Sequence, residues 1–291
     1  MTEQEYYLSL QQGEKNLEYK YIDLEYAKKG ISGYNYDFEY LDEYTKLKDM
    51  YNLENIAKNG STLSKALNIM QWLTNSTYYC GQSKCNGEEV FSILEYGLKG
   101  GFDHAIRCDQ KSIVLSECLL ALNILALPIA LESYDFNDTG DIITGIGSHS
   151  CTHIYLPEEE KWIMLDPSFN AYFTDKNGTI LNIIEIKDTL KKREPVILSQ
   201  YNLNGHEDIF RKGYPCNFIY NLSFRISTWD GNHQSNRVYN KNLLYPEGIE
   251  KQKYYIMKQR ANGGKEDAIK ASLSSVRYIF ADELLAVPSF V

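Results

Sequence analysis

The segment that decides the fold is C-D-Q-K-S-I-V-L-S-E-C-L-L-A-L-N-I, residues 108–124. From Ile113 onward its apolar residues cover most of a helical circumference, which is typical of a buried helix. The pattern therefore predicts a central helix from Asp109 to about Leu125, with Cys108 immediately before it. Free amide N–H groups and the helix dipole favour negative charge at such a position, so a thiolate is favoured there.

Another helix is predicted upstream, between Ser61 and about Asn75. Ser61 is a suitable N-cap, because its hydroxyl can accept a hydrogen bond from an amide of the first turn. The apolar residues that follow recur at three- and four-residue spacing and share one helix face. They are Leu63, Leu67, Met70 and Leu73.

Downstream, residues 149–156 (H-S-C-T-H-I-Y-L) and 161–166 (K-W-I-M-L-D) alternate as strands do, and the polar turn between them predicts an antiparallel hairpin. Period 2 places His149 and Cys151 on one face of the first strand and Asp166 on one face of the second. If residues 156 and 161 pair, Cys151 lies opposite Asp166 and His149 lies one diagonal step away. A two-residue shift would put His149 directly opposite, and either register leaves His149 and Asp166 within side-chain reach.

Cys108, His149 and Asp166 are the parts of a nucleophile, a base and an orienting acid. A thiolate attacks an acyl carbon, an imidazole moves the proton, and a carboxylate holds the ring in one tautomer and supports the imidazolium. This chemistry requires no metal ion and no cofactor, and we expect neither.

These motifs resemble those of bacterial members of the transglutaminase-like superfamily of papain-like cysteine enzymes. Residues 108–124 align without a gap with the family's C-D-D-K-A-x-x-L-x-x-L-L-R-A-L-G-I. Residues 149–156 align with H-A-W-x-E-V-Y-L, and W-I-M-L-D-P-S at 162–168 aligns with W-V-x-L-D-P-T. The resemblance covers roughly residues 61–175.

The resemblance implies an α+β fold in which the nucleophile lies at the N-terminus of a central helix that packs on an antiparallel sheet. It implies that Cys108 is the nucleophile, His149 the general base and acid, and Asp166 the residue that orients His149. The chain departs from the family at three positions near the site. Arg107 replaces a small residue, Cys151 replaces an aromatic residue and His153 replaces an acidic one, so the family's donor specificity does not transfer.

Each of the three residues also has a structural interpretation. Cys108 could be a thiol that ends a buried helix. His149 could be a hydrogen-bonded strand histidine, and Asp166, which precedes Pro167, could be a turn former. The ordered set of three motifs favours the catalytic interpretation over these.

The remaining cysteines and histidines are predicted to be structural. Three of them lie on a loop, on a strand or in the apolar middle of the central helix: His104, His153 and Cys118. Cys80 and Cys85, spaced C-x4-C, could join Cys151 or His153 in a zinc site. Zinc clusters normally show a tighter C-x2-C spacing and a second matched pair, so we predict no metal site.

Composition narrows the class of partner. The 291 residues include 43% apolar and 24% charged residues and carry a net charge of −9, which suits a globular protein and disfavours nucleic-acid binding. No stretch approaches the roughly 18 apolar residues of a membrane span, and the sequence starts M-T-E-Q-E-Y-Y-L-S-L without a basic leader. We therefore expect a cytoplasmic protein with free thiols and no membrane partner.

Three regions are predicted: a helical lead-in at 1–60, a catalytic core at 61–180 and a β-rich extension at 181–291. The core has 7 basic and 15 acidic residues, net −8. In the extension, the runs 218–224, 254–257 and 274–280 favour further antiparallel strands. These strands could extend the core sheet or fold over the cleft, and the sequence leaves both open.

A Cys-His-Asp triad makes a thioester acyl-enzyme, whose fate depends on whether water or an amine reaches the carbonyl. The first hypothesis is an acyltransferase that passes an acyl group from an amide, a peptide or a carrier-protein thioester through Cys108 to an amine. The acidic core suits a cationic amine, and amide-forming relatives occur in natural-product biosynthesis. The alternatives are a cysteine peptidase or amidase, in which water accepts the acyl group, and an inactive binding module.

Overall fold

A computed structural model gives the structure of most of the chain. It describes residues 25–27, 35–36, 41–136, 142–192, 194, 196–199, 222–228, 240–244, 247, 250, 255–257, 259–260, 263–273 and 276–290. Helix-like patches before residue 25 belong to the predicted lead-in and lie outside these ranges. The lead-in, core and extension boundaries remain predictions.

Helix α6 (Cys108–Leu120) is buried from Gln110 onward and packs against strands β2 (Ala126–Phe136) and β3 (Ile142–Leu156). The prediction of a buried central helix is confirmed, but its predicted end near Leu125 is wrong. Asn123 adopts a left-handed φ of 58°, and its N–H bonds to the carbonyl of Leu120 at 2.9 Å. Asparagine tolerates this conformation better than most residues, so the chain turns there and enters β2.

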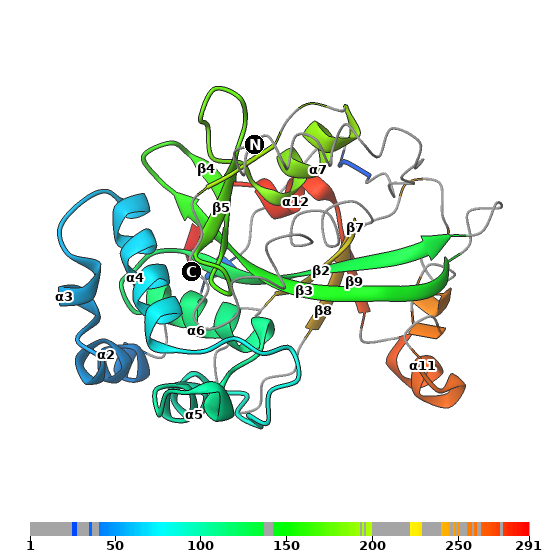
Figure 1. Cartoon of the computed structure of the whole chain (residues 1–291). Helices are drawn as coiled ribbons and strands as arrows, with labels where there is room; N and C mark the ends of the chain where they lie inside the picture. Colours follow the sequence, from blue (N-terminus) through cyan, green and yellow to red (C-terminus); the bar gives the residue numbers. More distant parts are fainter. Residues whose placement is uncertain are drawn as a thin grey trace, which may run out of the picture.

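The predicted upstream helix is confirmed as α4 (Thr62–Ser76), and Ser61 is its N-cap. The Ser61 hydroxyl accepts a hydrogen bond from the Ser64 N–H at 3.2 Å. The buried face of α4 lies over α6, and Figure 1 shows α4 and α5 beside that central helix. The smaller helices on this side are α2 (Leu41–Met50), α3 (Leu53–Ala57), α5 (Val90–Gly97) and the 3-10 turn η1 (Phe102–His104).

The helices pack on an eight-stranded sheet with the order β6-β5-β4-β3-β2-β7-β8-β9. Its remaining strands are β4 (Lys161–Asp166), β5 (Ala171–Thr174), β6 (Ile197–Leu198), β7 (Leu222–Thr228), β8 (Asn240–Leu244) and β9 (Val276–Ile279). All neighbours are antiparallel except β8 and β9. The fold is therefore α+β, with helices on a mainly antiparallel sheet.

The predicted hairpin is confirmed with its first register. Residues Leu156 and Lys161 pair across the turn, and the ladder runs to Thr152 opposite Leu165. One further step places Cys151 opposite Asp166. The hairpin therefore brings the end of β4 beside the middle of β3.

The C-terminal strands extend the core sheet, because β7 pairs with β2 on the edge away from β3. The strand predicted at 274–280 is present as β9, but it runs parallel to β8. Helix α11 (Glu266–Ser272) lies in the connection, which is long enough for the crossover that parallel strands need. The short helix α12 (Ala281–Leu285) follows β9.

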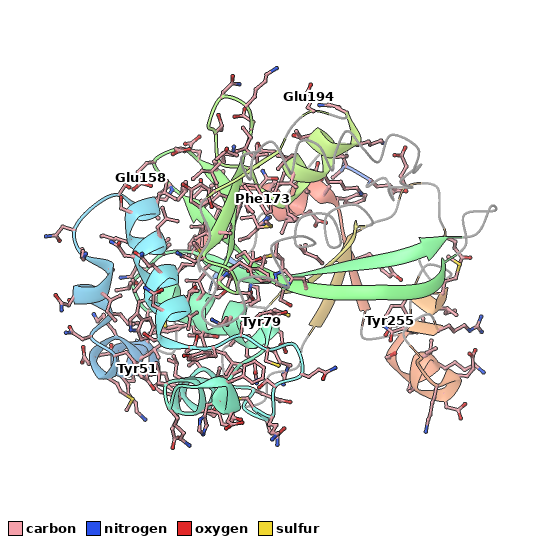
Figure 2. All side chains as sticks on the ribbon, in the orientation of Figure 1. Tyr51, Tyr79, Glu158, Phe173, Glu194 and Tyr255 are labelled. Atoms are coloured by element: carbon pink, nitrogen blue, oxygen red, sulfur yellow. The ribbon has the colours of Figure 1, made fainter. Side chains whose placement is uncertain are left out.

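The strand predicted at 254–257 is wrong, since residues 255–257 are helical. A short apolar run has the same appearance in either state. Here a helical turn buries Tyr255, which Figure 2 labels. The Tyr255 hydroxyl lies 2.8 Å from that of Ser272 on α11.

Two further elements complete the description. Helix α7 (Ile183–Lys191) follows β5, and strands β1 (Asn35–Tyr36) and β10 (Ser289–Phe290) form a separate parallel pair. Among the residues described, no helix is long and apolar enough to cross a membrane.

Candidate active site

Cys108 is the first residue of α6, and its neighbours fix the start of that helix. The backbone N–H of Arg107 donates to the Gln110 side chain at 3.0 Å, which closes the first turn. The guanidinium of Arg107 donates two hydrogen bonds of 3.0 Å to Asp109 and one of 2.9 Å to the carbonyl of Cys85. The half-buried Cys108 thiol is therefore presented from a rigid helix end.

Strand β3 is tied to the same end of α6 through Ser112. The hydroxyl of Ser112 donates to the Cys151 carbonyl and lies 3.0 Å from the hydroxyl of Thr152. Because Ser112 lies about one helical turn after Cys108, these contacts set the position of the nucleophile candidate relative to the strand that carries His149.

His149 and Asp166 form a fully buried pair. The His149 Nε2 atom lies 2.7 Å from Asp166 Oδ2, and both side chains have an exposed fraction of 0%. The other carboxylate oxygen of Asp166 accepts a hydrogen bond of 2.8 Å from the Ser168 N–H. Asp166 therefore contacts both His149 and the backbone of the turn that follows it, so the geometry is compatible with both predicted interpretations.

The Cys108 side chain lies close enough to His149 to affect the pKa of the ring. Burial by itself lowers the pKa of His149, but the negative charge of Asp166, the nearby Cys151, the hydrogen bond that Asp166 accepts and the nearby Cys108 together outweigh it. The pKa of His149 is raised well above its usual value. The site therefore favours a proton on the His149 ring, which the Asp166 carboxylate stabilises. The structure brings Cys108, His149 and Asp166 together in the order that the sequence analysis expects.

A second thiol lies in the same place. Cys151 is fully buried, and its Sγ atom, a ring nitrogen of His149 and a carboxylate oxygen of Asp166 all lie within 4.8 Å of one another. Burial, and to a lesser degree Asp166, raises the pKa of the Cys151 thiol to about 12. Cys151 is therefore a neutral thiol at physiological pH, and it differs from Cys108 in being closed off from solvent.

Two aromatic side chains that the sequence analysis did not identify line the site. The Phe169 ring centre lies 5.4 Å from those of His149 and Tyr79. Tyr79, labelled in Figure 2, is held by a bridge between its backbone and Ile106, just before α6. Burial, and then the charge of Cys108, raises the pKa of Tyr79, so its hydroxyl stays protonated beside the site.

Lys111 is a buried charged residue that the sequence analysis also did not identify. It lies on α6 about one turn after Cys108, is 1% exposed, and donates a hydrogen bond of 3.1 Å to the Thr77 carbonyl. Burial lowers the pKa of Lys111 to about 7, and the charge of Asp166 opposes this shift. Lysine is common on helices, so its position in the sequence carried no signal of burial.

The side chains predicted to be structural have structural partners. His153 is fully buried, and its Nε2 accepts a hydrogen bond of 3.1 Å from the Ile183 N–H at the start of α7. His104 bonds to the Gly100 carbonyl at 3.0 Å, and Cys118 is fully buried in the core. Within the described part of the chain, Cys80 and Cys85 join no group of metal-ligating side chains.

Comparisons with known proteins give one weak structural similarity. No protein-family model matches the chain, and no curated protein matches it. A solved structure from Cytophaga hutchinsonii, described as a candidate cysteine protease, is 20% identical with a TM-score of 0.31. The match covers 62% of this chain and 58% of that one, so less than two thirds of the other protein is spanned.

Proposed function

We propose that the chain is a cysteine acyltransferase that forms an amide by passing an acyl group from a thioester or amide donor, through Cys108, to an amine. The observation that carries the proposal is the buried pair of His149 Nε2 and Asp166 at 2.7 Å, with the Cys108 side chain near enough at the start of α6 to raise the pKa of His149. We also propose that the α+β fold has the transglutaminase-like arrangement, because its motifs lie on a central helix and an adjoining hairpin.

The roles follow from the bonds that must form and break. His149 takes the proton of Cys108, and the thiolate attacks the acyl carbon of the donor. His149 then gives the proton to the leaving thiol or amine, which leaves a thioester on Cys108. An incoming amine attacks this thioester and loses a proton to His149, and Cys108 departs as the thiolate. Asp166 holds the ring and supports the imidazolium through both halves.

Cys108 is the better nucleophile of the two thiols beside His149. Its side chain is half-buried, whereas Cys151 has an exposed fraction of 0%. Cys108 also lies at the N-terminus of a thirteen-residue helix, where the helix dipole stabilises negative charge. Cys151 lies within a strand beside the Asp166 carboxylate, which opposes a second negative charge.

The charge of the core and the resemblance favour transfer to a cationic amine, and the free thiols fit the proposed location. Residues 61–180 carry a net charge of −8, which attracts cations. The motifs resemble a family with amide-forming biosynthetic members. The five described cysteines are free thiols, as expected in the reducing cytoplasm, where we propose that the enzyme acts on a peptide, amide or carrier-protein thioester.

The test is to trap and locate the acyl-enzyme. The full chain is incubated with a panel of acyl thioesters and glutamine peptides, and the modified peptide is identified by mass spectrometry. The variants are Cys108→Ser and, as a matched thiol beside the same histidine, Cys151→Ser. We expect the acyl group on Cys108, and its loss only in Cys108→Ser. Adducts on Cys151 would contradict the proposed nucleophile.

The second half-reaction is tested by adding diamines to the acyl-enzyme. We expect the amide as the main product and a faster release of the acyl group as the diamine concentration rises. A product spectrum that diamines leave unchanged would identify a hydrolase. A Cys108 that no donor acylates would favour the inactive binding module.

A further inference from the structure

The thiol of Cys151 has no part in the proposed reaction, although it lies beside the two residues that activate Cys108. Its Sγ atom, a His149 ring nitrogen and an Asp166 oxygen lie within 4.8 Å of one another, and all three residues are buried. Among the described residues, this is the group of three His, Cys, Asp or Glu side chains whose ligand atoms lie close enough to hold one metal ion. Cys151 stands where the resembling family has an aromatic residue, so this thiol is a feature of this chain.

We propose that Cys151, His149 and Asp166 form an inhibitory binding site for a thiophilic divalent cation of the zinc class. Such a cation in its usual tetrahedral site has bonds of about 2.0–2.3 Å, which sets neighbouring ligand atoms about 3.3–3.8 Å apart. No two of the three atoms are more than about 1 Å too far apart for this spacing, and the 2.7 Å contact of His149 Nε2 with Asp166 has to open by about 0.6 Å where these are the ligand atoms. Small side-chain rotations supply both changes.

The ligand chemistry selects the metal. A thiolate with an imidazole and a carboxylate suits zinc and its neighbours, whereas magnesium and calcium prefer oxygen ligands alone. On binding, the Cys151 thiol and the protonated His149 ring each release a proton to solvent, and the sulfur and the ring nitrogen form bonds to the metal. One thiolate and one carboxylate then balance a divalent charge, which reduces the cost of burying it. The buried Lys111 near Asp166 acts against the cation and weakens its binding.

The site is rigid where a metal requires rigidity. His149 and Cys151 are two residues apart on one face of β3, and Asp166 follows from the paired strand β4. The Cys151 backbone is held by the Ser112 hydroxyl and by pairing with Ile129 of β2. The half-buried Cys108, which lies near His149, or a water molecule takes the fourth position.

Inhibition follows if the proposed function holds. A metal ion on the His149 ring or on its Asp166 partner stops the ring from taking the proton of Cys108. Binding of the metal itself does not depend on that function, so the two proposals can fail separately.

The binding test uses the metal-free full chain titrated with Co²⁺, which gives thiolate charge-transfer absorption and intense visible bands in a tetrahedral site. Zn²⁺ is then added as a competitor. The variants are Cys151→Ala and the near-isosteric Cys151→Ser, and Cys118→Ala is the control for removal of an equally buried thiol. Circular dichroism and thermal unfolding check that each variant folds.

We expect the native chain and Cys118→Ala to bind one Co²⁺ with a thiolate band that Zn²⁺ removes. Both Cys151 variants should lose the band and bind more than about tenfold more weakly, because losing even a group that only orients a ligand costs about 10–100-fold. The proposal is overturned if the native chain shows no thiolate band, or if the band survives in a folded Cys151 variant.

An activity arm separates the two proposals. Acylation of Cys108 is measured with and without Zn²⁺, and each variant is normalised to its own metal-free rate. We expect Zn²⁺ to inhibit the native chain and Cys118→Ala strongly, and the Cys151 variants at least about tenfold less. Metal binding without acylation in any condition would refute the proposed function alone. Acylation that Zn²⁺ does not affect would refute the inhibitory site alone.

Discussion

Two positions on one face of β3 hold histidines in opposite states. His149 and His153 lie four residues apart on β3, and both are fully buried. Burial lowers the pKa of His153 to about 3, whereas the pKa of His149 is raised well above its usual value because Asp166 outweighs the same burial. The partner therefore sets the charge of the ring: a carboxylate at His149 and the Ile183 N–H at His153.

Within the single strand β3, His149 thus belongs to the candidate active site, whereas His153 has a structural role. The His149 end meets the start of α6, where a thiol and a carboxylate converge on the ring. The His153 end meets the start of α7, where the ring accepts a backbone hydrogen bond at 3.1 Å and stays neutral. Changing the partner of either histidine should move it toward the state of the other.

The largest effect is expected from Asp166→Asn. An amide in place of the carboxylate leaves His149 buried without its negative partner, so its pKa falls and the ring resembles His153. We expect acylation of Cys108 to slow by a factor on the order of 10³–10⁴, measured as the single-turnover rate. The control is Asp175→Asn, in an exposed turn. A rate within tenfold of the native one would show that Asp166 does not orient His149.

The pH dependence of stability tests the other histidine. The folded pKa of His153 is about 3 and its usual value is 6.5, so below pH 6.5 the unfolded chain binds a proton that the native chain does not. Keeping His153 neutral therefore costs no free energy of unfolding above pH 6.5, and it lowers the free energy of unfolding progressively as the pH falls toward 3. Between pH 6.5 and about pH 4 the loss is about 3 kcal/mol.

His153→Gln isolates this contribution, because glutamine can accept the Ile183 hydrogen bond but does not titrate in this range. The free energy of unfolding in urea is measured at both pH values for the native chain and for the variant. We expect the difference between them to shrink at low pH by about 3 kcal/mol. His104→Gln, which changes a partly exposed histidine, should follow the native chain. Parallel pH curves for the native chain and His153→Gln would show that His153 is protonated in the fold.

The next effect in size is expected from Ser112→Ala at the His149 end. The variant leaves the buried Cys151 carbonyl and the Thr152 hydroxyl without the Ser112 hydroxyl, which costs about 1–3 kcal/mol of stability. The contact also sets the distance from α6 to β3, so we expect slower acylation of Cys108 as well. Unfolding in urea and the acylation rate check the two effects. A stability loss with an unchanged rate would limit Ser112 to a scaffold role.

The site was predictable where local rules decide the geometry. Strand periodicity and a short turn brought Asp166 beside His149, and the helix pattern placed Cys108 at a helix start. The end of α6 was not predictable from the apolar pattern, since that pattern continues through Ile124 while Asn123 turns the chain. The parallel pairing of β9 also depends on the crossover through α11, which no period-2 pattern records.

The states of the buried groups were less predictable than their positions. Lys111 is buried because the Thr77 carbonyl lies within reach of its ammonium group, and that contact joins two helices distant in sequence. Cys151 was placed opposite Asp166 by the register, but its neutrality depends on the complete burial that only the packed structure supplies. Tertiary contacts therefore decide whether a buried side chain is charged, as His149 and His153 show.

The smallest effect is expected from Asn182→Ala at the His153 end. The Asn182 side chain accepts hydrogen bonds from the N–H groups of Ile184 and Glu185 at 3.0 and 2.9 Å, and Glu185 accepts one from the Asn182 N–H at 2.8 Å. This capping box starts α7, so its loss should cost about 1 kcal/mol, read from urea unfolding. The acylation rate should stay at the native value, because α7 meets β3 at His153 and not at His149. A slower rate in a folded Asn182→Ala would mean that the surroundings of His149 and His153 are coupled, and that the two positions do not act separately.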